Sequence, residues 1–162
     1  MTVGKSSPMG TRAGAGQSGP EAGADRPYTR TLAALRARGL RPTRQRLALG
    51  RLLFESGDRH VTAEALHAEA AAAGVRVSLA TVYNTLHQFT DAGLLRQVAV
   101  DHGRIYFDTN IADHHHFFHV DEARLVDIPG ERIAVTGLPD VPEGAEMERV
   151  DVVVRIKRPR PA

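Results

Sequence analysis

The sequence predicts an α+β protein, in which a helical N-terminal half ends in a β-hairpin and a small β-rich unit follows. Residues 29–92 carry apolar side chains at helical spacing between capping residues and glycines. Two short β-like runs come next, Leu95–Val100 and Arg104–Phe107, around Asp101-His102-Gly103. Helices followed directly by a hairpin are typical of a winged helix-turn-helix. Any small α/β unit with an amphipathic helix is the alternative.

The N-terminal half begins with a segment unlike the rest of the chain. Residues 1–27 are rich in Gly, Ser, Ala and Pro, which predicts a disordered tail. Three helices are then predicted, each with a capping threonine or a terminating glycine: Thr29–Arg38 before Gly39, Thr43 to about Ser56, and Thr62 to about Ala73 before Gly74.

The fourth helix organises this half. Ser78 is a good N-cap and Gly93 a good terminator. Between them one face is apolar and the opposite face is polar without acidic residues, with side chains that can reach base edges. The apolar face consists of Leu79, Val82, Leu86 and Phe89, and the polar face of Thr81, Tyr83, Asn84, His87 and Gln88.

Charge divides the chain in the same way. Residues 26–107 hold 12 arginines and 6 acidic residues, whereas residues 108–149 hold 3 arginines and 10 acidic residues. A basic module favours a polyanionic partner, and Arg41, Arg44 and Arg46 cluster where a helix start favours phosphate. Ordinary solvated arginines are the alternative.

Other classes of protein are disfavoured by what the sequence lacks. There is no cysteine, which excludes disulfides, thiolate zinc sites and cysteine nucleophiles. No apolar run is long enough to span a membrane, and the N-terminus has no secretory h-region, so we expect a cytoplasmic protein with no membrane partner.

Histidines mark the β-rich unit. Strands are predicted at His114–Val120, Arg124–Ile128 and Val150–Lys157. Residues two apart in a strand share a face, so His114 and His116 point together and His115 points away. Three further residues could complete an N/O site for Zn, Fe or Mn: His60, Asp108 and Asp127. The neighbouring phenylalanines could instead favour haem at His114, His115 and His116, and surface or core histidines are the alternative to both.

Several motifs together resemble the ferric uptake regulator (Fur) family. They are Gly-Leu-Arg-Pro-Thr-Arg-Gln-Arg (39–46), His-Val-Thr-Ala-Glu-Ala-Leu (60–66), Leu-Ala-Thr-Val-Tyr-Asn-Thr-Leu (79–86), Asp-Ala-Gly-Leu-Leu (91–95) and His-His-His (114–116). Within that family the chain is most similar to the iron response regulators (Irr), through His-His-His-Phe-Phe, Val-Asp-Ile-Pro and the short C-terminal region ending in Val-Asp-Val-Val-Val-Arg.

The resemblance implies a homodimeric regulator with a winged helix-turn-helix DNA-binding domain at residues 28–108 and a β-rich, metal- or haem-sensing dimerisation domain at 109–162. It implies that Tyr83 reads thymine edges and Arg41 enters an A·T-rich minor groove. The expected DNA-binding set is Arg41, Arg44, Ser78, Thr81, Tyr83 and Asn84. The metal positions that the resemblance implies are His60, Asp108, His114, His116 and Asp127, and His115 points toward a second site.

The chain also departs from the family pattern. Asn84 replaces the usual arginine, and Asp108 and Asp127 replace the usual glutamates. The Cys-X-X-Cys pairs of the family's structural zinc are absent, as is the Cys-Pro haem motif of some Irr proteins, so any haem response must use histidines.

We therefore expect a dimeric repressor of iron- and haem-linked genes that binds double-stranded DNA at an A·T-rich, near-palindromic operator. Its DNA affinity would fall when haem or haem-delivered iron engages the histidines. One alternative is a Fur-type repressor that is activated by Fe, Mn or Zn. The others are a small His/carboxylate metalloprotein and a protein that stores metal or haem. An enzyme is not expected, because there is no His-Glu-X-X-His motif and no evident general base beside the histidines.

Overall fold

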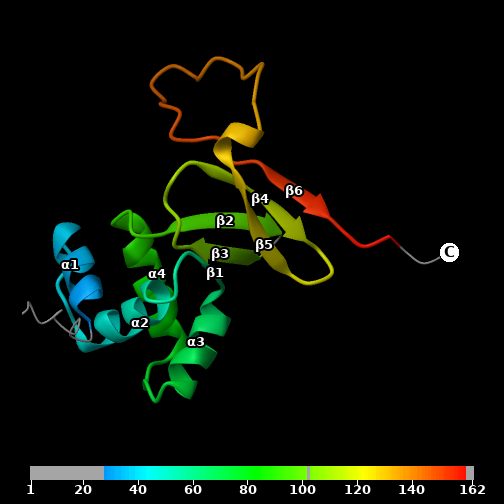
Figure 1. Cartoon of the computed structure of the whole chain (residues 1–162). Helices are drawn as coiled ribbons and strands as arrows, with labels where there is room; N and C mark the ends of the chain where they lie inside the picture. The colour runs from blue at the N-terminus through cyan, green and yellow to red at the C-terminus, as the bar shows by residue number, and fades with distance from the viewer. Residues whose placement is uncertain (1–27, 102, 160–162) are drawn as a thin grey trace, which may run out of the picture.

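The structure is a computed structural model that describes residues 28–101 and 103–159, so the predicted tail at 1–27 lies outside the described residues. The α-helices lie together at one end of the molecule, and two small sheets follow them (Figure 1). The helices are α1 (Thr29–Ala37), α2 (Arg44–Phe54), α3 (Ala63–Ala72) and α4 (Leu79–Asp91). The strands are β1 (His60–Val61), β2 (Arg96–Asp101), β3 (Arg104–Asp108), β4 (His114–His119), β5 (Arg124–Pro129) and β6 (Val153–Ile156), and a 3₁₀ turn, η1, covers Gly130–Arg132.

The helices begin at the predicted caps. The side chains of Thr43, Thr62 and Ser78 each accept a hydrogen bond from the backbone N–H three residues later. Gly74 and Gly93, which follow α3 and α4, have φ of 73° and 68°, in the left-handed region that L side chains rarely adopt. The predicted helices are therefore confirmed to within about two residues at each end.

The helical core fixes α4 against the first sheet. Leu49, Leu66, Leu86 and Phe89, from α2, α3 and α4, are completely buried in one cluster with Phe107 of β3. Because Phe107 contributes a whole aromatic ring to this core, the hairpin cannot move independently of the helices. The order α2, α3, α4 and hairpin is that of a winged helix.

The first sheet has the order β1-β3-β2 and the second has the order β5-β4-β6. The two-residue strand β1 was not predicted, because two residues give no alternation to detect; it pairs His60 with Asp108. In the second sheet β4 is antiparallel to β5 and parallel to β6. The predicted strand at 150–157 is shorter in the structure, Val153–Ile156.

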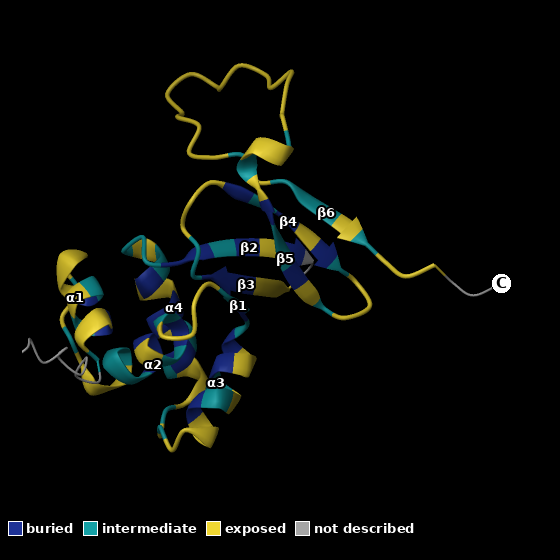
Figure 2. Cartoon of the chain, in the orientation of Figure 1, coloured by how far each residue is buried: buried dark blue, intermediate teal, exposed yellow. Residues whose placement is uncertain are grey.

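The two sheets pack face to face through a second apolar cluster. Val98 and Tyr106 of the first sheet contact Phe118 and Leu125 of the second, and all four are buried. The first sheet thus lies between the helices and the second sheet, whereas residues 134–149 form an exposed loop (Figure 2). The α+β class is confirmed. No helix in the described ranges is both long and apolar enough to cross a membrane.

The packing of α1 on α2 predicts the effect of a methyl group at Gly50. A Cβ there would lie 2.5 Å from Cγ2 of Thr31, which is itself buried. Gly50→Ala should lower the free energy of unfolding by about 1–2 kcal/mol, because the clash outweighs the gain in helix propensity. Thr31→Ser removes the clashing methyl group, so the double variant should recover most of the loss in urea denaturation. Equal effects of Gly50→Ala in both backgrounds would contradict this packing.

Candidate metal centre and nucleic-acid interface

A cluster of three histidines and two aspartates lies where the two sheets meet. It consists of His60, Asp108, His114, His116 and Asp127, and one nitrogen or oxygen atom from each lies within 4.8 Å of all the others. Strand pairing creates the cluster, because β1–β3 places His60 opposite Asp108 and β4–β5 places His116 opposite Asp127. The structure thus brings together all five predicted metal positions.

The atoms of this cluster are in close contact. Nε2 of His114 lies 2.8 Å from Oδ2 of Asp108 and 3.0 Å from Nε2 of His116. Nε2 of His116 lies 3.3 Å from the same Asp108 oxygen. Nε2 of His60 lies 2.9 Å from Oδ1 of Asp127. The Nε2 atoms of three imidazoles therefore converge on two carboxylates.

Burial makes this arrangement unusual. Asp108 and His116 are completely buried and His114 is 5% exposed. Nε2 of His60 and Oδ1 of Asp127 are also buried, and despite their proximity neither makes a hydrogen bond of acceptable geometry within the described part of the chain. Buried polar atoms are nearly always satisfied. A divalent cation such as Zn²⁺, Fe²⁺ or Mn²⁺ fits this set of three imidazole nitrogens and two carboxylates, and it would satisfy the two atoms that have no hydrogen bond among the described residues.

Asp108 is held as a carboxylate. Burial raises its pKa, but the hydrogen bonds from His116 and from the backbone N–H of Asn110, together with the proximity of His60, lower the pKa of Asp108 far below its ordinary value. Asn110 also donates from its side-chain amide to Oδ2 of Asp127, at 3.1 Å. One residue thus orients both carboxylates. Sequence reasoning missed it, although an aspartate such as Asp108 often accepts a hydrogen bond from the backbone N–H two residues later, the position of Asn110.

Arg96 of β2 is a second residue that sequence reasoning missed. It is 5% exposed, and it donates to the Ala112 carbonyl and, at 2.7 Å, to Oδ1 of Asp151. Nδ1 of His114 lies 2.8 Å from the same carbonyl. Nη1 of Arg96 also lies 3.0 Å from this Nδ1, so Arg96 and the Ala112 carbonyl together hold the imidazole with its Nε2 in the cluster.

His115 does not belong to this cluster. It lies on the opposite face of β4, where its Nδ1 accepts a hydrogen bond from the backbone N–H of Val152 at 3.4 Å. Its side chain borders a hollow with Ile133, Val135 and Arg149. The three consecutive histidines are therefore divided between two faces of the sheet, as alternation predicts.

The candidate nucleic-acid surface lies on the exposed face of α4 and the start of α2. Arg46 joins the two, because Nε and Nη2 donate to Oε1 of Gln88 at 3.1 and 2.8 Å and Nη1 donates to the Arg41 carbonyl at 2.7 Å. The hydroxyl of Tyr83 donates to Glu64 of α3 at 2.6 Å. This bond lowers the pKa of Glu64 and raises that of Tyr83.

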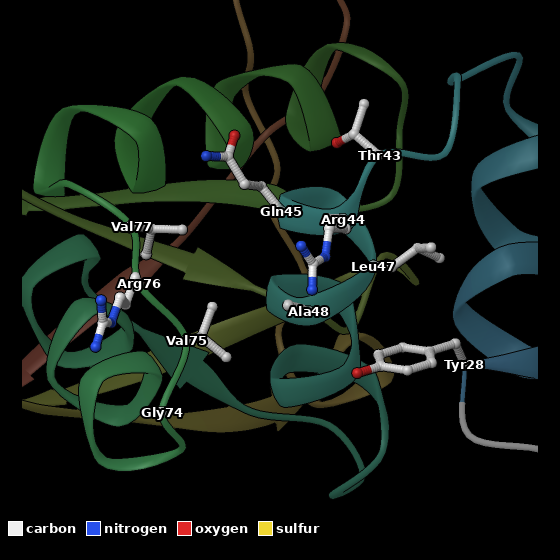
Figure 3. A pocket seen from close by; sticks show the side chains of 10 residues that line it. All are labelled: Tyr28, Thr43, Arg44, Gln45, Leu47, Ala48, Gly74, Val75, Arg76 and Val77. Atoms are coloured by element: carbon white, nitrogen blue, oxygen red, sulfur yellow. The ribbon is translucent and has the colours of Figure 1, made fainter.

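A hollow of about 880 Å³ continues this surface between the start of α2 and the α3–α4 connection (Figure 3). Arg44 borders it from α2 and Arg76 from the connection, and both are exposed. Exposed arginines near a helix start are suited to phosphate. Arg76 was not among the predicted contacts, since a single cation in a connecting segment forms no pattern.

Comparison with known proteins identifies the family of this chain. The model of the ferric uptake regulator family matches residues 37–153. The chain belongs to the ferric uptake regulator family. Among Fur relatives, the ferric uptake regulation protein of Shigella flexneri is 34% identical over 101 residues, which cover 62% of this chain and 68% of that protein. The peroxide-responsive repressor PerR of Staphylococcus epidermidis is 31% identical over 103 residues, covering 64% and 68%.

Solved structures agree with this assignment. The ferric uptake regulator of Pseudomonas aeruginosa, solved with manganese, superposes with a TM-score of 0.61 at 26% identity, over 80% of this chain and 98% of that one. The Vibrio cholerae regulator gives 0.61 at 24% identity, over 78% and 98%, which shows the fold. The predicted winged-helix and β-rich dimerisation architecture is confirmed. Proteins of the Fur family are dimeric DNA-binding transcription regulators. The expectation that this chain is a regulator and not an enzyme is therefore confirmed.

The position of Arg96 in this member of the Fur family predicts a large effect of its removal. Arg96→Ala should lower the free energy of unfolding of the metal-free protein by about 2–3 kcal/mol, because it empties the buried space of the Arg96 side chain beside His114 and removes its hydrogen bonds to Ala112 and Asp151. Arg149 also pairs with Asp151, at 2.8 Å, but its side chain is 31% exposed. Arg149→Ala should therefore cost less than about 1 kcal/mol. Urea denaturation measures both, and equal losses would be inconsistent with a special role for Arg96.

Proposed function

We propose that this chain is a cytoplasmic, homodimeric, sequence-specific repressor of iron-linked genes whose DNA affinity is controlled by a divalent metal. The metal would be held by His60, Asp108, His114, His116 and Asp127. One observation carries the proposal, namely that five potential ligand atoms from the two sheets lie within 4.8 Å of one another.

The chemistry of the donor set supports iron, manganese or zinc. Mg²⁺ and Ca²⁺ prefer oxygen ligands, whereas imidazole nitrogens combined with carboxylates suit first-row transition metals. When bound, such a cation would supply positive charge to the buried Asp108 and to the buried oxygen of Asp127. A similar chain, the Pseudomonas aeruginosa regulator, was solved with manganese.

The position of the cluster supports a route from metal to DNA. His60 and Asp108 belong to the sheet that packs on the helices, whereas His114, His116 and Asp127 belong to the other sheet. Ligands shared between two packed sheets favour one angle between them over others. In a dimer that angle sets how far apart the two α4 helices lie, and two half-sites must match that spacing.

The DNA side of the proposal rests on the face of α4 and the basic start of α2. We propose contacts from Arg41, Arg44, Ser78, Thr81, Tyr83 and Asn84, with Arg41 in an A·T-rich minor groove. Exposed positive charge at Arg41 and Arg44 supports phosphate and groove binding. A symmetric dimer favours a near-palindromic operator.

Removing a buried ligand tests the metal site. His116→Ala should weaken Mn²⁺ binding at least 10- to 100-fold, because the loss of even an outer-shell partner costs about that much. DNA affinity should then no longer respond to metal. The control is His119→Ala, which changes a histidine of the same strand outside the cluster. Competition with a chromophoric chelator measures metal affinity, and fluorescence anisotropy on promoter fragments measures DNA affinity.

The sign of the metal effect distinguishes the regulatory schemes. DNA binding that requires added Mn²⁺ or Fe²⁺ would support a metal-activated repressor. Selective binding by metal-stripped protein that metal does not change would contradict metal control while keeping the regulator. An absence of selective DNA binding under both conditions would overturn the proposed function.

A second candidate is the haem-responsive, Irr-like regulator that the sequence resemblance favours. His114 and His116 are buried among other ligands, so a porphyrin would have to open the cluster to reach them. His115 is more accessible, and Ile133, Val135 and Arg149 lie around it. Apolar side chains and a cation suit a porphyrin ring and its propionates, so haem control would use His115 first.

Haem titration separates these histidines. If haem binds at His115, His115→Ala should weaken the Soret-band change at least 10-fold, because an axial ligand is lost, whereas His116→Ala should leave it nearly unchanged. Unchanged haem affinity after alanine substitution of His114, His115 and His116 together would exclude the histidine route. Haem that releases the protein from DNA would support the Irr-like scheme.

A further inference from the structure

The exposed face of α4 carries five polar side chains, and the structure divides them into two classes. Four of them form hydrogen bonds to other parts of the chain: Thr81, Tyr83, His87 and Gln88. The side chain of Asn84 is exposed and has no hydrogen-bond partner in the described ranges. It lies in the second turn of α4, near the helix start, where recognition helices contact base edges.

The bound side chains have lost part of their capacity to read a base. The Tyr83 hydroxyl gives its only proton to Glu64. The Thr81 hydroxyl is engaged with Ser78, 2.9 Å away. Nδ1 of His87 contacts the side-chain amide of Gln97 at 3.0 Å, which leaves that imidazole one nitrogen for DNA. None of the three offers a free, adjacent donor and acceptor.

Gln88 carries the same amide group as Asn84, and its contacts exclude the same use. Its Oε1 accepts two hydrogen bonds from Arg46, at 3.1 and 2.8 Å. A carbonyl oxygen has two lone pairs, so this acceptor is filled. Gln88 can still donate from its NH₂ group, but it cannot donate and accept together. Its contacts also fix α4 relative to the start of α2, where Arg46 holds the Arg41 carbonyl.

Resting on the proposed function, we infer that Asn84 reads one adenine in each half-site through a bidentate contact in the major groove. Adenine presents the N7 acceptor beside the N6 amino donor, and an amide matches that pair by donating to N7 and accepting from N6. Guanine presents two acceptors there, so the carbonyl oxygen of Asn84 would meet another acceptor. Asn84 is therefore the specificity-determining residue of α4, and the fixed side chains around it hold its register.

The experiment uses the full chain loaded with Mn²⁺ and begins with selection of binding sites from a randomised DNA duplex library. The selected half-site is then synthesised with each base pair at each position, and with 7-deazaadenine or purine in place of each adenine. The first analogue lacks the N7 acceptor and the second lacks the N6 amino group. Affinities are measured by anisotropy for the wild type, Asn84→Ala, Asn84→Arg and Arg44→Ala.

For the wild type we expect one adenine per half-site at which any other base, or either analogue, weakens binding on the order of 10- to 100-fold. In Asn84→Ala, the affinities for the different bases and analogues at that position should become nearly equal, whereas the base preferences at the other positions should not change. Asn84→Arg should shift the preference there to guanine, which arginine contacts at O6 and N7. Arg44→Ala, the control, should weaken all sequences about equally, as the loss of a phosphate contact does.

The outcomes separate this inference from the function on which it rests. Selective binding whose base preferences Asn84→Ala leaves unchanged would overturn the role of Asn84 and keep the regulator. A wild-type chain with no sequence preference, with or without Mn²⁺, would overturn both. Because Asn84 is exposed and makes no hydrogen bond to the part of the chain that the structure describes, its variants should fold, and matching melting temperatures would verify this.

Discussion

Asp108 is the constraint on which the rest of the structure depends. A fully buried carboxylate is tolerated only where hydrogen bonds and opposite charge compensate for lost hydration. Here the compensation comes from His60 on the same sheet and from His114 and His116 on the other sheet. The two sheets must therefore meet in one register, or the charge is left without partners. Two further segments are held in place around this carboxylate. Asn110, in the connection before β4, donates to Asp108, and Arg96 binds Asp151, which lies just before β6.

The same strand connects this charge to the recognition helix. Phe107 and Asp108 are neighbours in β3, and successive residues of a strand point to opposite faces. Phe107 packs into the helical core, where its ring meets that of His87 of α4 edge-on, with the two ring centroids 5.8 Å apart. Asp108 faces the histidines of the cluster. Two adjacent residues, Phe107 and Asp108, therefore couple a change at the cluster to the position of α4. No long chain of intermediate contacts is needed to couple them.

The elements that the sequence predicted best are those with local causes. Thr43, Thr62 and Ser78 satisfy backbone groups three residues away, so their roles could be read from the sequence alone. Strand β1 has only two residues, and the parallel pairing of β4 with β6 joins segments far apart in the chain, so neither could be inferred. Sequence reasoning named all five cluster residues, partly by strand alternation and partly by family resemblance. It did not find Asn110 or Arg96, because their partners are distant in sequence or belong to the backbone.

The sequence by itself determined the helices, the alternation that separates His115 from His114 and His116, and the family. These follow from local hydrogen bonding, from the two-residue period of a strand and from recognisable motifs. Only the tertiary structure decided which polar groups are already engaged. In the folded chain the side-chain carbonyl of Gln88 accepts hydrogen bonds from Arg46, and the Tyr83 hydroxyl donates to Glu64, whereas Asn84 stays exposed. Whether a side chain is free to bind something else depends on neighbours brought together by folding, and no local pattern records those neighbours.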